Sequence, residues 1–470
     1  MAAPVVRALL PALGFGAAYS AAILVGRATR VEGSEVSLVW PAAAVAVLWG
    51  IHARGLPRRT AAFHWIALAV LTCGVNLTTG ATVGLAVWFV TVNVALAAVT
   101  TAVLGYDDRE IALRDPADLG RLVVAVTCGT LVAAALATVY FAAVGHERLP
   151  QTFVLFAVRN GVTALAGAAV VLRLHEAQWR RPQPSRLRLV ETLACIVVTV
   201  LVFGRVFWFN PGLPTAFGIM LPSMWISLRY STTAGTLFLA AAGGSIVWAT
   251  LLDRGALRGI APQEQALLAQ GMVGCLATVV LTLALFRDSR NDLIERLRHL
   301  ALHDPLTGLA NRTLLTERLD DAIARSAPGT VGVILMDLDG FKLVNDAWGH
   351  EEGDLLLIEI ARRLQATVRA GDTVARLGGD EFVVVCTRLS EPSELRLCAE
   401  RIRAHVAQPY GQASDAPYDR ITASIGTALS ERSCNSRSLL SDADKAMYDD
   451  KRSRTRRPAR VTALAARPAR

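Results

Sequence analysis

The segment Arg376-Leu-Gly-Gly-Asp-Glu-Phe-Val383 decides the fold of the C-terminal part of this 470-residue chain. Apolar residues flank two glycines and two carboxylates, a pattern that predicts two strands joined by a tight hairpin turn. Gly378 and Gly379 permit the positive φ that such turns need and leave room for a ligand against the backbone. Asp380 and Glu381 concentrate negative charge at the turn, which suits a metal ion, a proton or another cation. The hairpin is therefore the first candidate for a functional site.

A second acidic turn lies upstream, in Val333-Ile-Leu-Met-Asp-Leu-Asp-Gly-Phe-Lys342. Its apolar run predicts a buried strand, and Asp337 and Asp339 share one face of it because side chains alternate with period two. Carboxylates at a strand end suit Mg²⁺, which proteins bind through a few carboxylates together with substrate phosphates. Gly340 and Lys342 then offer backbone N–H groups and a positive charge for phosphate oxygens. The two turns together predict a site for a metal and a phosphorylated substrate.

Polar side chains continue after this turn, in Leu-Val-Asn-Asp-Ala-Trp-Gly-His-Glu-Glu-Gly-Asp. The amide of Asn345 and the carboxylate of Asp354 could pair with the edges of a purine, and His350 lies between them. These side chains are therefore candidates for recognising a purine.

Residues 302–456 resemble the GGDEF domain of the diguanylate cyclase family, because several family motifs stand in order and at family-like spacing. A generic α/β domain with acidic turns would not carry the whole ordered set. The motifs are Asp304-Pro-Leu-Thr-Gly-Leu-Ala-Asn-Arg312, Asp337-Leu-Asp-Gly-Phe-Lys-Leu-Val-Asn-Asp346, Gly378-Gly-Asp-Glu-Phe382, Ser424-Ile-Gly426 and Ala443-Asp-Lys-Ala-Met-Tyr-Asp-Asp-Lys451.

The resemblance implies that two GTP molecules are joined into cyclic di-GMP with release of two pyrophosphates. Each domain would hold one GTP, so that the active unit is a homodimer with Mg²⁺ or Mn²⁺ as the cofactor. In this reaction the 3′-oxygen loses a proton and attacks the α-phosphate. Most of the rate enhancement then comes from positioning the two nucleotides and from neutralising the charge on the attacking and leaving oxygens.

The resemblance also assigns a role to each residue of the two turns. Asp337 and Asp380 would bind the metal through their side chains, and Leu338 through its carbonyl. Asp380 would also be the base at the 3′-hydroxyl. The other assignments are Lys342 and Glu381 for catalysis, Gly340, Phe341, Lys342 and Lys451 for the phosphates, Asn345 and Asp354 for guanine, and His350 beside the nucleotide. The chain departs from the family after Lys451, where Arg-Ser-Arg-Thr-Arg456 replaces the usual Gly-Arg-Asn turn.

Arg369-Ala-Gly-Asp372 lies five residues before the hairpin glycines, at the spacing of the family's product-inhibition site. An arginine fork stacks on and bonds to guanine, and a carboxylate accepts from the N–H edge of that base. The pair therefore predicts an allosteric site for cyclic di-GMP. The alternative is a surface ion pair that closes a helix.

Residues 1–286 have a different character. The chain is 53% hydrophobic, because several apolar runs are each long enough to cross a hydrocarbon layer of about 30 Å as a helix. We expect an α-helical membrane domain of about ten spans, followed by an α/β domain with a central mixed sheet flanked by helices, similar to nucleotide cyclases and polymerase palms. The candidate spans are 8–26, 36–53, 62–79, 81–104, 121–145, 152–172, 189–208, 215–229, 233–252 and 266–286.

Basic residues predict the orientation of these spans. Arginines follow the second, fourth, sixth, eighth and tenth spans, so those loops and both termini are expected on the cytoplasmic side of a bacterial inner membrane. The net charge of +9 owes much to these loops and the tail, and no nucleic-acid surface is expected. The region is similar to the first type of membrane-associated sensor domain, through Val39–Ala44, Leu221–Tyr230 and Trp248–Gly255.

Three further features leave alternatives open. Residues 287–301 carry Leu293, Leu297 and Leu300 on one helical face, which predicts a stalk that pairs two chains or a mere surface helix. Arg159 lies inside the sixth span, where a charge marks a ligand path or a bond between helices. Residues 457–470 form a basic tail that we expect to be disordered.

The sequence therefore predicts a membrane-bound diguanylate cyclase. The alternatives are a catalytically silent receptor for GTP or cyclic di-GMP, and a transporter with a regulatory nucleotide domain. The second would be favoured by inverted repeats among the spans.

Overall fold

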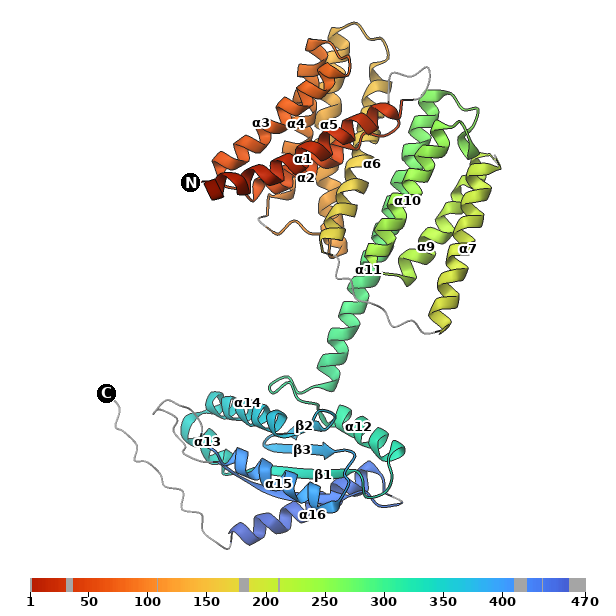
Figure 1. Cartoon of the computed structure of the whole chain (residues 1–470). Helices are drawn as coiled ribbons and strands as arrows, with labels where there is room; N and C mark the ends of the chain where they lie inside the picture. Colours follow the sequence, from red (N-terminus) through yellow and green to blue (C-terminus); the bar gives the residue numbers. More distant parts are fainter. Residues whose placement is uncertain are drawn as a thin grey trace, which may run out of the picture. The chain divides into compact units, whose positions relative to one another are not determined.

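The computed structural model describes residues 2–30, 37–107, 109–176, 186–209, 212–409, 421–432 and 434–455. The chain divides into two units, Met1–Asp292 and Leu293–Arg470, which Figure 1 shows with their elements labelled. Each unit is described by itself. The predicted disordered tail, 457–470, lies outside the described residues.

The first unit is built of helices (Figure 1). In the described ranges, eight helices are long and apolar enough to cross a membrane. Two of the ten predicted spans correspond instead to shorter helices of 13 and 10 residues, α2 and α9. The helices are α1 Ala2–Ala28, α2 Ala42–Arg54, α3 Arg58–Thr78, α4 Val83–Leu104, α5 Pro116–Ala143, α6 Leu149–His175, α7 Arg186–Trp208, α8 Leu213–Ala216, α9 Met220–Arg229, α10 Thr232–Leu251 and α11 Pro262–Leu302.

Small residues let these helices approach closely, and buried polar groups find partners between them. A Cβ at Gly129 of α5 would lie 2.7 Å from the backbone carbonyl oxygen of Leu96 in α4, so glycine lets the two helices approach this closely. The Trp49 indole N–H donates to His64 Nδ1 at 2.8 Å across α2 and α3. The outward face of α7 is apolar and exposed. These features are consistent with a helical bundle in lipid, where polar groups turn inward and apolar side chains turn outward.

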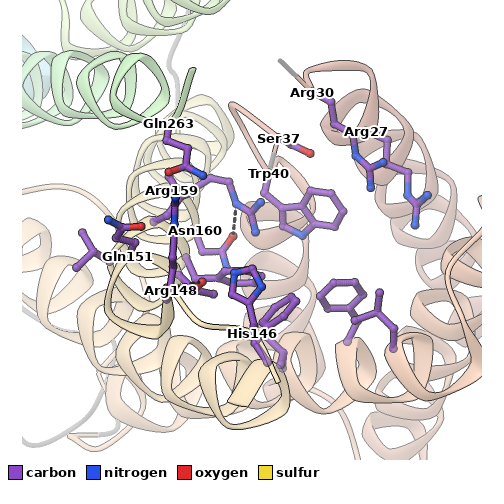
Figure 2. A pocket seen from close by; sticks show the side chains of 18 of the residues that line it. Arg27, Arg30, Ser37, Trp40, His146, Arg148, Gln151, Arg159, Asn160 and Gln263 are labelled. Carbon is purple, nitrogen blue, oxygen red and sulfur yellow. Dashed lines mark hydrogen bonds between the residues drawn. The ribbon is translucent and has the colours of Figure 1, made fainter. Parts of the chain in front are cut away.

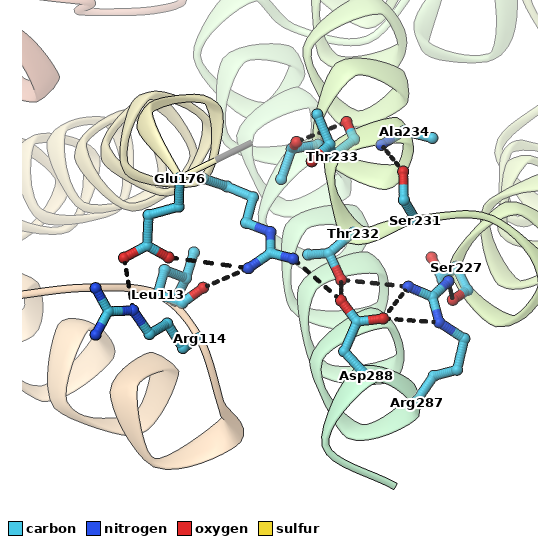
Figure 3. Close-up of polar contacts among 12 residues, drawn as sticks. Leu113, Arg114, Glu176, Ser227, Ser231, Thr232, Thr233, Ala234, Arg287 and Asp288 are labelled. Atoms are coloured by element: carbon cyan, nitrogen blue, oxygen red, sulfur yellow. Dashed lines mark hydrogen bonds and ion pairs between the residues drawn. The ribbon is translucent and has the colours of Figure 1, made fainter. Parts of the chain in front are cut away.

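A polar network joins the end of α6 to α11 (Figure 3). Arg173 of α6 donates to Asp288 of α11 at 3.2 Å. Asp288 also accepts from Arg287 and from the hydroxyl of Thr232, and Arg287 donates to the Ser227 carbonyl at 2.7 Å. Asp288 therefore ties α11 to α6 and to Thr232 of α10, and Arg287 ties it to α9.

The second unit contains a four-stranded sheet in the order β2-β3-β1-β4 (Figure 1). Its strands are β1 Gly332–Asp339, β2 Thr373–Gly378, β3 Glu381–Cys386 and β4 Thr422–Leu429. The expected α/β architecture is confirmed, but the expectation of a mixed sheet is wrong for the described strands, because every paired strand is antiparallel. The parallel pairing is limited to isolated bridges such as Ala310 with Ala375.

Helices cover both faces of this sheet. The alternation of side chains along β1 sends Ile334 and Met336 into one core and Val333 and Leu335 into the other. The first core contains α14 His350–Thr367 and α15 Pro392–Val406, and the second contains α12 Arg312–Arg325 and α16 Ser436–Thr455. The predicted burial of β1 is confirmed. Asp337, being odd-numbered, shares the face of the strand that α16 covers.

Candidate active site

The hairpin forms as the sequence predicts. β2 and β3 pair through Gly378 and Glu381, and φ is +152° at Gly378 and +53° at Gly379, a conformation that glycine adopts without strain. Arg376 braces the turn, since its Nη2 donates to the Gly379 carbonyl at 2.7 Å. Its Nη1 meets Asp304 Oδ1 at 2.9 Å. The side chain of Arg376, for which the sequence suggested no role, thus holds the hairpin in place.

Asp337 and Asp380 come together at the edge of the sheet. Asp337 of β1 pairs with Glu381 of β3, and the Leu338 N–H donates to the Asp380 carbonyl at 3.3 Å. Burial, together with the charge of Asp337, raises the pKa of the Asp380 carboxyl above its usual value of 3.8. A cation bound between the two carboxylates would stabilise the ionised form of Asp380.

Lys451 of α16 supplies a positive charge at this edge. Its Nζ donates to Asp337 Oδ1 at 2.6 Å, and this bond raises the pKa of the Lys451 ammonium. The family's turn after this lysine is replaced here by helix, because α16 continues to Thr455. The lysine therefore reaches the site from a helix.

The residues present fit a divalent metal. Asp337 and Asp380 offer hard oxygen ligands, and Mg²⁺ takes its remaining ligands from water and substrate phosphates. No cluster of three or more His, Cys, Asp or Glu side chains suited to a metal occurs in the described ranges, so the two carboxylates would act with backbone and substrate oxygens. Asp339 differs from them, because it accepts hydrogen bonds from Ser424 and Thr422 of β4 at 2.6 and 2.9 Å.

The turn predicted to hold phosphates follows β1 directly. Gly340 has φ +84°, so the chain turns sharply into α13, Phe341–Trp348. The first N–H groups of a helix have no acceptor within the helix and attract anions. Lys342 lies in this first turn with an exposed side chain. Backbone donors and a cation thus follow Asp337 closely in the chain.

Asn345 and Gly353 form the candidate guanine site. Asn345 of α13 has a buried Oδ1 that bonds to no partner within the described structure. A Cβ at Gly353 of α14 would meet Asn345 Cγ at 3.0 Å and the ring of Phe341 at 3.4 Å. The Asn345 side chain therefore occupies a space that any side chain at position 353 would fill. His350 and Asp354 lie four residues apart on α14, on one exposed face.

Arg369 and Asp372 lie apart from the hairpin, because β2 intervenes with a length of about 17 Å. Asp372 accepts from the Arg369 N–H at 3.2 Å and from the Thr387 N–H at 3.1 Å. The Arg369 guanidinium pairs with Glu394 at 3.2 Å. Arg369 and Asp372 both line a cavity of about 500 Å³ that also takes in His303.

Several residues of this site were not singled out in the sequence. Asp450 accepts from the Ile425 N–H at 2.9 Å and from Arg403 at 2.9 Å, so that it fastens α16 to β4. A Cβ at Gly426 would collide with the backbone of α16. Asp304, Arg376, Gly426 and Asp450 belong to quoted motifs and Gly353 to the quoted segment that ends at Asp354, but the sequence assigned none of them a role of its own.

Comparison with known proteins concerns the same part of the chain. Residues 301–457 match the family described as "Diguanylate cyclase, GGDEF domain". The bifunctional diguanylate cyclase/cyclic di-GMP phosphodiesterase MucR of Pseudomonas aeruginosa is 49% identical over 177 residues, which cover 37% of this chain and 25% of MucR. The diguanylate cyclase TpbB of the same species is 40% identical over 159 residues, which cover 33% of this chain and 36% of TpbB.

A crystal structure of a sensory box/GGDEF family protein from Caulobacter crescentus is 41% identical, with a TM-score of 0.30, and the match covers 32% of this chain and 99% of that chain. The chain spans about a quarter of MucR and about a third of TpbB. Through residues 301–457, which contain the paired carboxylates and the glycine hairpin, the chain belongs to the GGDEF domain family of diguanylate cyclases.

Proposed function

We propose that this protein is a membrane-bound diguanylate cyclase that condenses two GTP molecules into cyclic di-GMP and two pyrophosphates. The observation that carries the proposal is the meeting of Asp337 and Asp380 at one edge of the sheet, directly before the turn at Gly340. Family membership supports the same activity.

In the proposed reaction, each GTP contributes a 3′-hydroxyl and an α-phosphate. The 3′-oxygen of one nucleotide bonds to the α-phosphorus of the other, the bond to the β-phosphate breaks, and the hydroxyl proton leaves to a base. Asp380 would accept that proton, and its raised pKa would make it a better base than an ordinary aspartate. Mg²⁺ or Mn²⁺ held by Asp337, Asp380 and the Leu338 carbonyl would lower the pKa of the hydroxyl and neutralise the leaving pyrophosphate.

The remaining residues bind and orient the nucleotide. The N–H groups of Gly340 and Phe341 and the ammonium of Lys342 would hold the phosphates. Asn345 and Asp354 would bond to guanine, with His350 beside it and Lys451 and Glu381 next to the carboxylate pair. Asn345 supports this assignment because its buried Oδ1 is left for a ligand, and an unsatisfied buried acceptor costs about 1–3 kcal/mol.

The reaction requires two domains. Each domain offers one nucleotide site, so we propose a homodimer formed through the catalytic domain and through residues 287–301 of α11. Leu293, Leu297 and Leu300 are exposed along that helix, and exposed leucines at helical spacing favour pairing.

The proposal includes two kinds of regulation. Cyclic di-GMP would inhibit by binding at Arg369 and Asp372, which line a cavity away from the hairpin. The helices of the first unit would form a sensor in a bacterial inner membrane, with the catalytic domain on the cytoplasmic side where GTP is found. The eight long apolar helices support the membrane location.

The test is GTP turnover by the purified full-length protein with Mg²⁺, with products separated by chromatography and identified by mass. We expect cyclic di-GMP from the wild type and from Asp320→Asn, a matched change of an exposed carboxylate on α12. We expect none from Asp380→Asn. Wild-type protein that binds GTP as a dimer and still forms no cyclic di-GMP, after bound product is removed, would support the silent receptor instead.

A further inference from the structure

A cavity of about 880 Å³ lies inside the first unit. It is formed by the C-terminal ends of α1 and α3 and by the N-terminal parts of α4, α6 and α11, and Figure 2 shows the side chains that line it. All of its lining residues belong to this unit. The cavity is therefore a property of the helical bundle and independent of the GTP site.

Arg159 of α6 is the central charged group of the cavity wall. Only 6% of its surface is exposed. Its guanidinium lies 4.6 Å from the ring centre of Phe156 and 5.4 Å from that of Trp40, and its Nε meets Asn160 Oδ1 at 3.4 Å. Within the described part of the chain it forms no ion pair with a carboxylate.

Among the residues that the structure describes, no carboxylate compensates this buried charge. Removing a guanidinium from water costs several kcal/mol, and a buried charge normally has an opposite charge beside it. Two cation–π contacts of about 1–2 kcal/mol each offset part of that cost. Its one hydrogen bond within the described ranges goes to the next residue of the same helix, so the described bonds between helices do not explain the arginine. Its remaining donors are available to a ligand in the cavity.

Most of the other charged residues of the wall are also cationic. Arg27, Arg30 and Arg148 also line the cavity, whereas Glu264 is the one acidic residue among its described lining residues. Arg27 is held in place by bonds to the Thr79 carbonyl and to Asn76 Oδ1. The cavity thus presents several cations, one of them deeply buried, to any molecule inside it.

Aromatic rings make up much of the remaining surface, from Trp40, Phe89, Phe141 and Phe156. We propose that this cavity is a binding site for a small organic carboxylate, with the carboxylate on Arg159 and the apolar body against Trp40 and Phe156. Arginine recognises a carboxylate through two parallel N–H···O bonds. Apolar walls with a few polar anchor groups are typical of small-molecule sites.

The experiment measures binding of three probes to the full-length protein in lipid nanodiscs by isothermal titration calorimetry, with empty nanodiscs as the blank. Benzoate carries both the charge and the apolar body, benzamide lacks the charge, and formate lacks the body. We expect saturable binding of benzoate with a Kd of about 1 mM or tighter. We expect benzamide and formate to bind at least about tenfold more weakly, since each lacks one of the two contacts.

Variants assign the binding to the cavity. Arg159→Gln should weaken benzoate binding at least about tenfold. Arg159→Lys keeps the charge and loses the planar pair of N–H donors, so its affinity for benzoate should lie between those of the wild type and Arg159→Gln. Arg205→Gln, at an exposed arginine of α7 outside the cavity, should bind as the wild type does. Each variant is compared only after its elution volume and thermal transition show a folded protein.

Three outcomes would overturn the assignment. They are equal affinity for benzoate and benzamide, equal affinity for benzoate and formate, and benzoate binding that survives in folded Arg159→Gln. Absence of saturable benzoate binding up to roughly 10 mM would overturn it as well.

Discussion

Gly353→Ala separates nucleotide recognition from folding. The added Cβ would lie within 3.0 Å of Asn345 Cγ and would press on Oδ1 of the same side chain, so that the Asn345 amide must rotate away. Two hydrogen bonds to guanine at about 0.5–1.5 kcal/mol each would be lost. The sum of about 1–3 kcal/mol predicts a KM for GTP that is about 5- to 150-fold higher.

The same change should leave the stability of the domain nearly unaltered. Gly353 is the fourth residue of α14, and alanine stabilises a helix interior by about 1 kcal/mol relative to glycine. Moving Asn345 off its rotamer costs about 0.5–1.5 kcal/mol. These terms oppose each other, so the thermal transition of the catalytic domain should shift little while GTP affinity falls.

A double-mutant cycle with Asn345→Ala checks that the effect passes through Asn345. In steady-state turnover and in binding of a non-reacting GTP analogue, Gly353→Ala should add almost nothing once Asn345 is alanine. Independent, additive losses in the two variants would refute the reasoning, and so would a Gly353→Ala protein with wild-type KM.

The other predictions concern the carboxylate pair and α16. Burial and the charge of Asp337 raise the pKa of Asp380 in the folded protein above 3.8. The protonated carboxyl therefore contributes free energy of folding that is fully present below pH 3.8 and is lost as pH rises through the folded-state pKa. Asp380→Asn should remove this pH dependence of the unfolding free energy in denaturant titrations. Because Asp380 must ionise, the rate of GTP turnover should fall on the acid side of its pH profile with a midpoint above pH 3.8, and this midpoint should move to lower pH as the Mg²⁺ concentration rises. A midpoint that does not depend on Mg²⁺ would contradict the metal assignment. Lys451→Met removes a cation from Asp337, so Mn²⁺ should bind the nucleotide-free protein more tightly. The KM for GTP should rise about threefold, a small effect because the lysine side chain is 47% exposed. An unchanged Mn²⁺ affinity in calorimetry would contradict this role of Lys451. Gly426→Ala should destabilise the domain by about 1–3 kcal/mol in urea unfolding, because its Cβ would lie 2.8 Å from the Ala446 carbonyl carbon, and a wild-type midpoint would show that α16 yields without cost.

The local parts of the fold could be predicted because their signals are local. Two glycines between apolar runs require a hairpin, and the run before Asp337 requires a buried strand, and both are confirmed. The direction of strand pairing is a non-local property. A mixed sheet was expected, whereas β1 pairs antiparallel with both β3 and β4.

The membrane unit shows the same limit. Hydropathy located the helices but overestimated the length of two of them, since α2 ends after 13 residues and α9 after 10. Arg159 could be recognised as unusual from its place in an apolar run. Its neighbours Trp40 and Arg30 come from a distant part of the chain, so the cavity could not be foreseen.

Within the candidate site, the residues that carry charge are recognisable and those that position them are not. Asp337, Asp380 and Lys451 were assigned through motifs, and the structure brings them together. Gly353 and Asp450 act by making room for Asn345 and by fastening α16. Such roles depend on contacts between elements, for which one sequence holds no pattern.

The central claim is that this chain joins two GTP molecules, and the ratio of its products tests it most directly. Pyrophosphate and cyclic di-GMP are measured together while the full-length protein turns over GTP with Mg²⁺. The account predicts two pyrophosphates for every cyclic di-GMP at all times, and neither product from Asp380→Asn. Pyrophosphate released without cyclic di-GMP, or no product from a folded dimer that binds GTP, would contradict it.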